Sequence, residues 1–414
     1  MPGELTNWAR SVTFTASELL RPTSVAELRT LVAKAGKVRA LGTAHSFNDI
    51  ADTSGALVST SGLPGTFEID GVARTVRVAA GMRYAEVGRR LHERGHALAN
   101  LASLPHISVG GSVATGTHGS GDANGTLSTA VSAIEMVTAD GDLVELTRGD
   151  ENFDGAVVAL GALGVVTTVT LDILPTFDVR QYLYFGLPFE AIDEHFDDLF
   201  SAAYSVNLLT LWQEPSFELV WIKRHADQTG AEPTGESWFS AVPADQPVTT
   251  LGGAPCTEQL GIPGPWHERL PHFRPEFTPS TGVELQTEFF VPRSRAVGAL
   301  HALDEVRDRI APVVQASEIR TTAADDLWLS PAYGRATVGI SFTWVKDLGA
   351  VLPVVELLEE RLAPYDARPH WGKLFTTRPA DRYPRMNDFH ALMRHYDPGG
   401  KFTNGYVKRF VGGR

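Results

Sequence analysis

The sequence has very little cysteine and no run of basic residues. Cys256 is the single cysteine among 414 residues, which excludes an internal disulfide and a metal site built from several thiolates. The 36 Lys and Arg residues against 49 Asp and Glu give a formal charge of −13. A chain this acidic lacks the positive surface that nucleic acids and anionic membranes require. We therefore expect neither of these as a partner and expect a small molecule instead.

Long apolar runs are also missing. The most apolar stretch, residues 157–174, contains two glycines, Asp172 and several threonines, so it predicts a buried strand and turn rather than a membrane span. Met1 to Arg10 lacks the basic segment and apolar run of a signal peptide. We therefore expect a cytoplasmic, monomeric globular protein. Its length favours two or three domains, and a change of pattern after Pro175 favours two.

Short local signals predict elements before Pro175. Ser24 and Glu27 have the spacing of a capping box, which predicts the start of a helix. Residues 37–41 form a candidate strand. Asp-Gly pairs at 70–71 and 140–141 lie between apolar segments and predict two β-hairpins.

After Pro175, apolar strands alternate with helices. Strands are expected at 181–185, 208–212, 219–223, 285–290, 319–323 and 339–344. Helices are expected at 189–202, 295–310 and 354–362. Residues 226–278 are rich in Pro, Gly and Ser and predict a long excursion between these elements.

Residues 108–121 are unusually small. Five of these fourteen residues are glycine, and His118 is the single large side chain. Such a run lets backbone N–H groups approach a diphosphate closely. It contains neither the dinucleotide-binding G-x-G-x-x-G pattern nor a P-loop. A flexible Gly/Ser loop is the alternative.

Histidines occur in two patterns with chemical meaning. His45 directly follows the strand at 37–41 in a loop of small residues, where a cofactor would be met, although a lone histidine is more often structural. His92 and His96 match the zinc-protease pattern H-E-x-x-H. Gly95 is expected to end that helix and leave His96 outside it, so we expect no metal site.

Three candidate strands place polar side chains two residues apart, which puts each pair on one face. The pairs are Gln286 with Glu288, Glu318 with Arg320, and Ser341 with Thr343. A shared polar face would suit a polyhydroxyl ligand, and an ordinary half-solvated sheet is the alternative. Lys373, in His370-Trp-Gly-Lys373, is a candidate cation for a developing negative charge, with a solvated loop lysine as the alternative.

In this order, these segments resemble the covalent FAD oxidases of the vanillyl-alcohol oxidase type, and among them the alditol oxidases. The resemblance is carried by residues 41–48, 101–108, 108–118, 318–320, 370–373 and 401–404. It implies an α+β, two-domain fold of the vanillyl-alcohol oxidase (PCMH) type. Residues 1–175 would bind FAD, and residues 176–375 would form an α/β substrate-binding cap on a largely antiparallel sheet. Residues 376–414 would return to the first domain.

The resemblance also implies the cofactor contacts. FAD would be bound covalently through His45. Its other contacts would come from Ala40, Leu41, Gly42, Thr43, Ala44, Ser46, Ser103, Ser108, Gly111, Thr115, Gly116, Thr117, His118 and Val166.

A substrate site is implied in the same way. Substrate would contact Ser103, Glu318, Arg320, Thr343 and Lys373, with Ser341 and Gln286 beside them. The implied reaction oxidises a terminal primary hydroxyl of an alditol to the aldehyde, with FAD as hydride acceptor and dioxygen reduced to hydrogen peroxide. Xylitol, sorbitol and glycerol are the candidate substrates. Lys373 and Arg320 would be the catalytic residues.

The sequence departs from the alditol oxidases at two positions. Ser341 stands where they carry His, which changes the group beside the substrate threonine. Ala44 replaces a glycine before the flavin-bearing histidine, a mild change unless that residue needs a positive φ. A sugar-lactone oxidase or dehydrogenase of the same family is one alternative, and a non-catalytic polyol-binding protein is another. A zinc hydrolase based on His92 is a third.

Overall fold

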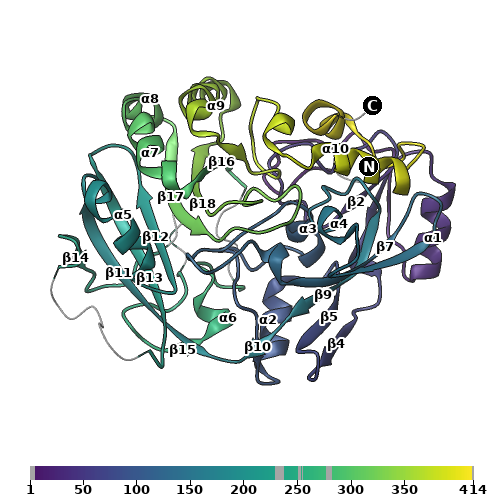
Figure 1. The fold of residues 1–414 in the computed structure, drawn as a ribbon, viewed down its shortest axis with the longest axis horizontal. Coiled ribbons are helices and arrows are strands. Elements are labelled where there is room, and N and C mark those ends of the chain that lie inside the picture. The colour runs from purple at the N-terminus through teal and green to yellow at the C-terminus, as the bar shows by residue number, and fades with distance from the viewer. Residues whose placement is uncertain (1–4, 229–236, 250–252, 254, 277–281, 413–414) are drawn as a thin grey trace.

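The computed structural model describes residues 5–228, 237–249, 253, 255–276 and 282–412, and it has an α+β fold, as expected (Figure 1). In its N-terminal part, a parallel sheet has the order β1 (Glu18–Leu20), β3 (Ala56–Ser59) and β2 (Val38–Leu41). An antiparallel sheet has the order β4 (Phe67–Asp70), β5 (Thr75–Ala79), β9 (Val165–Asp172), β7 (Val131–Val137) and β8 (Leu143–Thr147). Strands β6 (His96–Ala97) and β10 (Leu174–Pro175) pair separately.

Short helices surround these sheets. They are α1 (Val25–Lys34), α2 (Tyr84–His92), α3 (Val109–Ala114) and α4 (Phe153–Val157).

The remaining strands join into one large sheet. Among the described residues it has nine strands, all paired antiparallel, in the order β14, β11, β13, β12, β17, β18, β16 and β19, with β15 added beside β11. The long strands are β11 (Asp178–Pro188), β12 (Ser205–Thr210), β13 (Ser216–His225), β16 (Glu284–Pro292), β17 (Val314–Thr322) and β18 (Thr337–Val345). The short strands are β14 (Val242–Pro243), β15 (Gly264–Pro265) and β19 (Arg368–Pro369). The predicted antiparallel sheet is confirmed.

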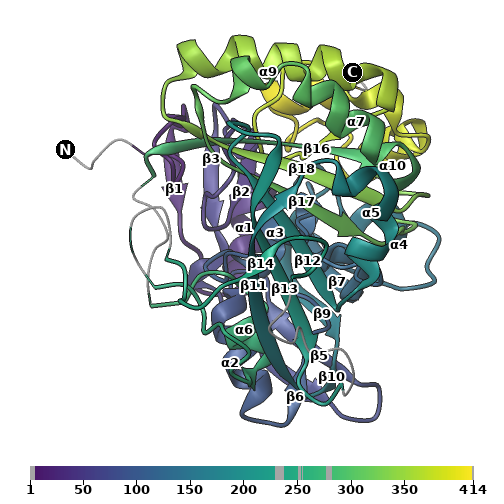
Figure 2. The same ribbon diagram turned by 90° about the vertical axis from the view of Figure 1, so that its left-hand side faces the viewer.

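Helices cover one face of this sheet. They include α5 (Ala191–Ser201), α7 (Ala296–Asp304), α8 (Arg307–Ile310) and α9 (Leu348–Leu362), while α6 (Trp266–Arg269) and α10 (Met386–Tyr396) lie elsewhere. Figures 1 and 2 show α7 and α9 next to each other over β16. Alternation along the strands explains the two faces. Phe289 and Phe342 are fully buried, whereas their neighbours Glu288 and Ser341 point to the opposite side, where the cavity described below lies.

The local turn signals are confirmed. Ser24 Oγ accepts a hydrogen bond from the N–H of Glu27, while the Glu27 carboxylate binds the N–H of Thr23 rather than that of Ser24. Both hairpins form. The first has a longer loop than two residues because the Asp70 carboxylate accepts bonds from the N–H groups of Val72 and Ala73.

Two element predictions need correction. The helix expected at 295–310 is two helices, because the chain leaves helical dihedrals at Val306 (φ −119°, ψ 19°). Helix α9 starts at Leu348 rather than at 354, because Asp347 caps it and Pro353 is accommodated inside it. The alternative of a flexible Gly/Ser loop for residues 108–121 is wrong for the first part of that run, which folds as α3.

The C-terminal residues contact the N-terminal part. Lys401 Nζ donates to the carbonyl oxygens of Val32 and Ala139 at 2.6 and 2.7 Å. Asn404 Nδ2 donates to Ile50 O at 3.0 Å.

The domain boundaries at 175 and 375 stay predictions. Parts of the 226–278 excursion lie outside the described residues, and its described parts include β14, β15 and α6. No described helix is long and apolar enough to cross a membrane.

Candidate active site

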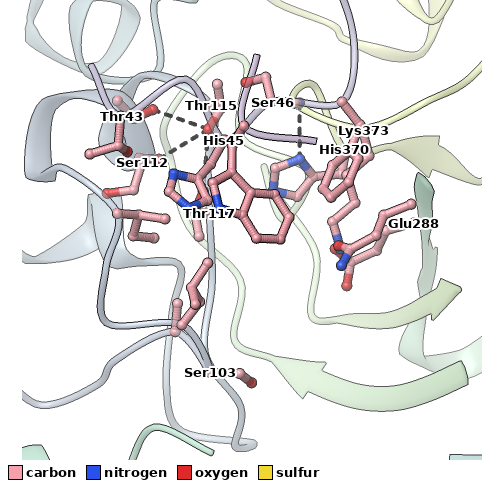
Figure 3. A pocket seen from close by; sticks show the side chains of 18 of the residues that line it. Thr43, His45, Ser46, Ser103, Ser112, Thr115, Thr117, Glu288, His370 and Lys373 are labelled. Atoms are coloured by element: carbon pink, nitrogen blue, oxygen red, sulfur yellow. Dashed lines mark hydrogen bonds and ion pairs between the residues drawn. The ribbon is translucent and has the colours of Figure 1, made fainter. Parts of the chain in front are cut away.

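A cavity of about 1080 Å³ lies between the polar face of the large sheet and the loops that follow β2 and precede α3. This volume is at the upper end of small-molecule sites, so it suits a large ligand. Figure 3 shows the two sides of the site. His45, Thr43, Thr115 and Thr117 are grouped together, and Lys373, His370 and Glu288 are grouped apart from them.

Nearly all the residues expected from the sequence line this cavity. From the cofactor set these are Ala40, Leu41, Gly42, Thr43, Ala44, His45, Ser46, Ser103, Ser108, Gly111, Thr115, Thr117, His118 and Val166. From the substrate set they are Ser103, Gln286, Glu318, Arg320, Ser341, Thr343 and Lys373.

Gly116 is the exception, and we correct its placement. It does not appear in the lining; its φ is +66°, and a Cβ there would lie 2.9 Å from Pro331 Cδ. Gly116 is therefore a turn residue packed against a neighbouring loop.

His45 is held in a well-defined position by the N-terminal segment. The indole of Trp8 stacks on its ring, with centroids 5.1 Å apart and planes 19° from parallel. Trp8 N donates to Ala44 O at 2.8 Å, and Asn7 Nδ2 donates to Ser46 O at 2.9 Å. Trp8 was not predicted as a site residue, because an aromatic residue near the N-terminus gives no local signal of its partner.

The His45 imidazole is neutral. Burial, with a smaller effect of the His106 charge, lowers its pKa to about 4. Its Nδ1 is buried and has no hydrogen-bond partner among the described residues. A neutral ring nitrogen with a free lone pair is a competent nucleophile.

The backbone before His45 is strained. Ala44 has φ of +57°, in the left-handed region that non-glycine residues rarely adopt. The departure from glycine at this position therefore falls where a positive φ is needed.

The loops around α3 are built for close approach. A Cβ at Gly42 would lie 2.4 Å from Ser108 Oγ, and a Cβ at Gly110 would lie 2.8 Å from Ala80 Cβ. Ser108 Oγ is buried without a partner among the described residues. An unsatisfied hydroxyl, a helix start and glycines together suit a diphosphate. With the orphaned Nδ1 of His45, these residues fit an FAD.

The floor of the cavity has polar side chains in register on three strands. The pairings align Glu318 of β17, Ser341 of β18 and Glu288 of β16, and they place Thr343 beside Gln286. All five line the cavity, so the expected common polar face exists.

Glu288 is the centre of the charges on this floor. Its carboxylate contacts Lys373 Nζ at 2.8 Å, His118 Nε2 at 2.9 Å and Arg320 NH2 at 3.2 Å. Burial alone would raise the pKa of Glu288, but the charge of Lys373 and the hydrogen bond from His118 outweigh it and hold the pKa well below its usual range. The sequence placed Glu288 on the polar face without assigning it to the site.

Glu318 has a second set of partners. Arg320 Nε lies 3.4 Å and His272 Nδ1 3.7 Å from its carboxylate oxygens. The opposing effect of burial is outweighed by Arg320 and His272, which lower the pKa of Glu318. His272 was missed by the sequence analysis. Its ring stacks on Trp221 with centroids 4.3 Å apart, and its backbone N–H donates to Ser103 O at 3.2 Å.

The His92 and His96 pattern does not form a zinc site. Helix α2 ends at His92, Gly95 has φ of +77°, and His96 pairs with Pro175 in β6, as the sequence predicted for the helix end. His92 Nδ1 contacts Thr176 Oγ1 at 2.8 Å instead. Within the described residues, no group of three or more His, Cys, Asp or Glu could hold a metal ion.

Two family models match the sequence. The FAD binding domain model matches residues 16–147, and the D-arabinono-1,4-lactone oxidase model matches residues 283–410. These spans contain residues 40–46 and 108–118 and most of the polar floor.

Individual relatives cover the whole chain. An alditol oxidase of a Streptomyces species is 52% identical over 100% of both chains. An L-gulono-1,4-lactone dehydrogenase of Mycobacterium tuberculosis is 30% identical over 98% of both, and the L-gulonolactone oxidase of Bos taurus is 27% identical over 97% of both.

Solved structures with the same fold include cholesterol oxidase from B. sterolicum. It superposes with a TM-score of 0.78 at 14% identity, covering 99% of this chain and 96% of the other. A solvent-stable cholesterol oxidase superposes with a TM-score of 0.80 at 15% identity, covering 99% and 97%. These likenesses establish the fold of the chain.

Proposed function

The chain belongs to the alditol oxidase family of FAD-binding oxidoreductases, and from that membership we propose that it oxidises a terminal primary hydroxyl of an alditol to the aldehyde. Xylitol and sorbitol are the proposed substrates, with glycerol as a shorter candidate. The observation that carries this proposal is the buried polar floor, where Lys373 and Arg320 meet Glu288 directly across from the FAD-binding loops.

We propose that FAD is attached covalently to His45. The neutral ring and its Nδ1, which makes no hydrogen bond among the described residues, support this. Residues 40–46 and 108–118 would hold the remainder of the cofactor. Bound FAD supplies a two-electron acceptor for the substrate hydride and passes the electrons to dioxygen, which leaves as hydrogen peroxide.

The residues of the floor have distinct proposed roles. Lys373 and Arg320 bind the reacting hydroxyl and stabilise its alkoxide as the proton leaves. Glu318, Ser103, Thr343, Ser341 and Gln286 bind further hydroxyls of the polyol. A floor made of hydrogen-bonding groups rejects analogues that lack a hydroxyl, because buried polar groups would then be left unpaired.

Acid precipitation tests the covalent link. We expect yellow colour to remain in the washed wild-type pellet and to be lost from the pellet of His45→Ala. As a control, His301→Ala removes an exposed imidazole paired with Asp193 and keeps its colour. Colour that washes out of the wild-type pellet would show that attachment fails in this chain, with Ala44 as the first suspect.

Peroxide yield tests the substrate. The proposal expects peroxide and aldehyde from xylitol and sorbitol at higher kcat/KM than from aldonolactones. The match of residues 283–410 and the mycobacterial relative support the alternative of a lactone oxidase or dehydrogenase. That alternative predicts a higher kcat/KM for aldonolactones than for xylitol and sorbitol. A non-catalytic polyol-binding protein would bind xylitol without bleaching the flavin. The cytoplasmic location and monomeric state stay predictions.

A further inference from the structure

Four segments that are distant in sequence meet at the Glu288 carboxylate. Glu288 comes from β16, Arg320 from β17, His118 from the segment after α3, and Lys373 from the segment after β19. Figure 3 shows Lys373 extending to Glu288 beside His370. The side chain of Glu288 is 1% exposed and that of His118 is 2% exposed.

We propose that Glu288 anchors the two cations of the reaction, and that His118 is a positioning residue that holds Glu288. The proposal rests on the proposed function, in which Lys373 and Arg320 contact substrate. It gives His118 a role on the substrate side of the cavity, in place of the cofactor contact that the family resemblance implies.

Both carboxylate oxygens of Glu288 are used by protein donors. Oε1 accepts from His118 Nε2 and Arg320 NH2, and Oε2 accepts from Lys373 Nζ. A carboxylate with this many buried partners has little capacity left for a substrate hydroxyl. Its contribution is therefore to the position and charge of the two cations.

His118 is fixed on both sides of its ring. Nδ1 contacts Gly119 O at 2.8 Å, and the ring edge packs on Phe290 with centroids 5.0 Å apart. Both ring nitrogens face acceptor oxygens, and the contact of Nε2 with the Glu288 carboxylate is a hydrogen bond when Nε2 carries a proton and donates it. The imidazole thus selects one orientation of the Glu288 carboxylate.

The neighbouring strand leaves room for this pair. A Cβ at Gly339 of β18 would lie 3.2 Å from Glu288 Oε1 and 3.4 Å from His118 Cε1. A side chain at this position would press directly on the contact between the two residues.

The charged and titratable groups around Glu288 are Lys373, Arg320, His118 and His370. His370 is neutral, because burial lowers its pKa to about 3, and its Nδ1 accepts from Gly372 N at 3.0 Å. Glu318 contacts Arg320 and is therefore one contact removed from Glu288. Glu288 is therefore the one anion in direct contact with the Lys373 ammonium among the described residues.

The first experiment measures kcat/KM for xylitol as a function of pH, together with covalent flavin content. We expect Glu288→Gln to lower kcat/KM about 100-fold, the effect of a misplaced catalytic group, with flavin content unchanged. Loss of the anion favours the uncharged amine of the partner lysine, so the alkaline limb of the pH profile moves to lower pH. The matched control Glu135→Gln removes a carboxylate paired with Arg77 outside the cavity and leaves both unchanged.

Two variants separate the role of His118 from simple packing. His118→Ala is expected to lower kcat/KM, whereas His118→Gln, which keeps an N–H donor near the position of Nε2, recovers most of the loss. If both variants instead lose flavin and are equally impaired, His118 holds the cofactor and the proposal is overturned. Glu288→Asp keeps the charge and serves as the second variant if Glu288→Gln does not fold.

Competitive acylation tests the anchor without relying on activity. The seven lysines of the chain are labelled at low reagent excess and compared by peptide mass spectrometry. Since only the uncharged amine reacts, Lys373 labelling is expected to rise about tenfold in Glu288→Gln relative to the other lysines. Unchanged labelling would overturn the anchor. If the wild-type enzyme oxidises no alditol but Glu288→Gln still shows this rise, the result contradicts the proposed function and leaves the anchor standing.

Discussion

Ala44 illustrates, at the scale of single residues, how one backbone angle bears on a cofactor loop. The left-handed conformation costs a non-glycine residue about 1–2 kcal/mol of conformational free energy. Ala44 has φ of +57° directly before His45. The carbonyl of Ala44 also accepts the N–H of Trp8, whose ring stacks on His45. The strained residue therefore connects the N-terminal segment to the histidine that would carry FAD.

The first prediction is that Ala44→Gly stabilises the protein. Relief of about 1–2 kcal/mol of strain is partly offset by about 0.4–1 kcal/mol of extra chain entropy in the unfolded state. We expect a net gain of about 0.5–1 kcal/mol in the free energy of unfolding, measured by urea titration. Ala33→Gly in α1 is the matched control and should lose about 1 kcal/mol. Equal losses in both variants would contradict the strain argument.

Lys373 carries the second prediction. Lys373→Ala removes one of the two cations that we propose to stabilise the alkoxide, and removal of one such donor lowers turnover by about 10²–10³-fold. Flavin content should be unchanged, because Lys373 lies outside the proposed cofactor segments at 40–46 and 108–117. The measurement is kcat with xylitol beside the absorbance of the washed acid pellet. Lys408→Ala, at an exposed position, is the control, and equal turnover in the two variants would exclude the role.

Some site residues were predictable one at a time and others were not. His45 and Lys373 lie in short segments whose neighbours give the signal. Glu288 and His118 are 170 positions apart and acquire their role only when β16 meets the segment after α3. Periodicity placed Glu288 on the correct face of its strand, but nothing local indicates that an imidazole will reach it.

At the scale of elements, α3 depends on glycines that allow close contact. Gly110 N donates to Ala80 O, and a Cβ at Gly110 would lie 2.8 Å from the Ala80 Cβ. Backbone and a short side chain cannot move aside as a flexible side chain would. The end of β5 therefore fixes how closely α3 approaches the cavity.

The third prediction follows from this contact. Gly110→Ala is expected to displace α3 and to lower the ratio of flavin to protein absorbance, together with a fall in Tm. Gly36→Ala is the matched control, since a Cβ at Gly36 meets nothing within 4 Å. A Gly110→Ala protein with full flavin content would show that α3 does not position the cofactor.

Helices and strands were predicted best where a single sequence pattern determines the type of element. Alternating apolar residues identified β16 and β18, because a sheet with one polar face repeats every two residues. Helix α3 was missed because glycine and small polar residues have low helix propensity. Its helical form comes from tertiary contacts such as that of Gly110 with Ala80. The start of α9 was predicted too late because Pro353 is unusual inside a helix, whereas the cap at Asp347 is the stronger signal.

At the scale of the whole molecule, the cavity depends on contacts between distant parts of the chain. One such contact joins Asp325, in the connection between β17 and β18, to the N-terminal part. Its carboxylate accepts from Ser330 Oγ at 2.6 Å and from Thr126 Oγ1 at 3.5 Å. The N–H of Trp328 in the same connection donates to Asp154 O at 3.1 Å. The charge state of Asp325 therefore bears on how the two parts hold together.

The last prediction concerns the pH dependence of that contact. Burial, which outweighs the hydrogen bond from Ser330, raises the pKa of Asp325 from 3.8 to about 6. The folded protein therefore binds this proton more tightly than the unfolded chain. Its stabilising effect is present below about pH 4 and is lost as the pH rises to about 6, a change of about 3 kcal/mol.

Asp325→Asn cannot titrate, so the free energy of unfolding of wild type minus that of the variant should fall by about this amount between pH 4 and pH 7. Urea unfolding at a series of pH values measures it. Asp308→Asn, at an exposed position, is the matched control for the substitution itself. A flat difference for Asp325→Asn would mean that the carboxylate is solvated in the folded protein, and that the contact with Thr126 does not bury it.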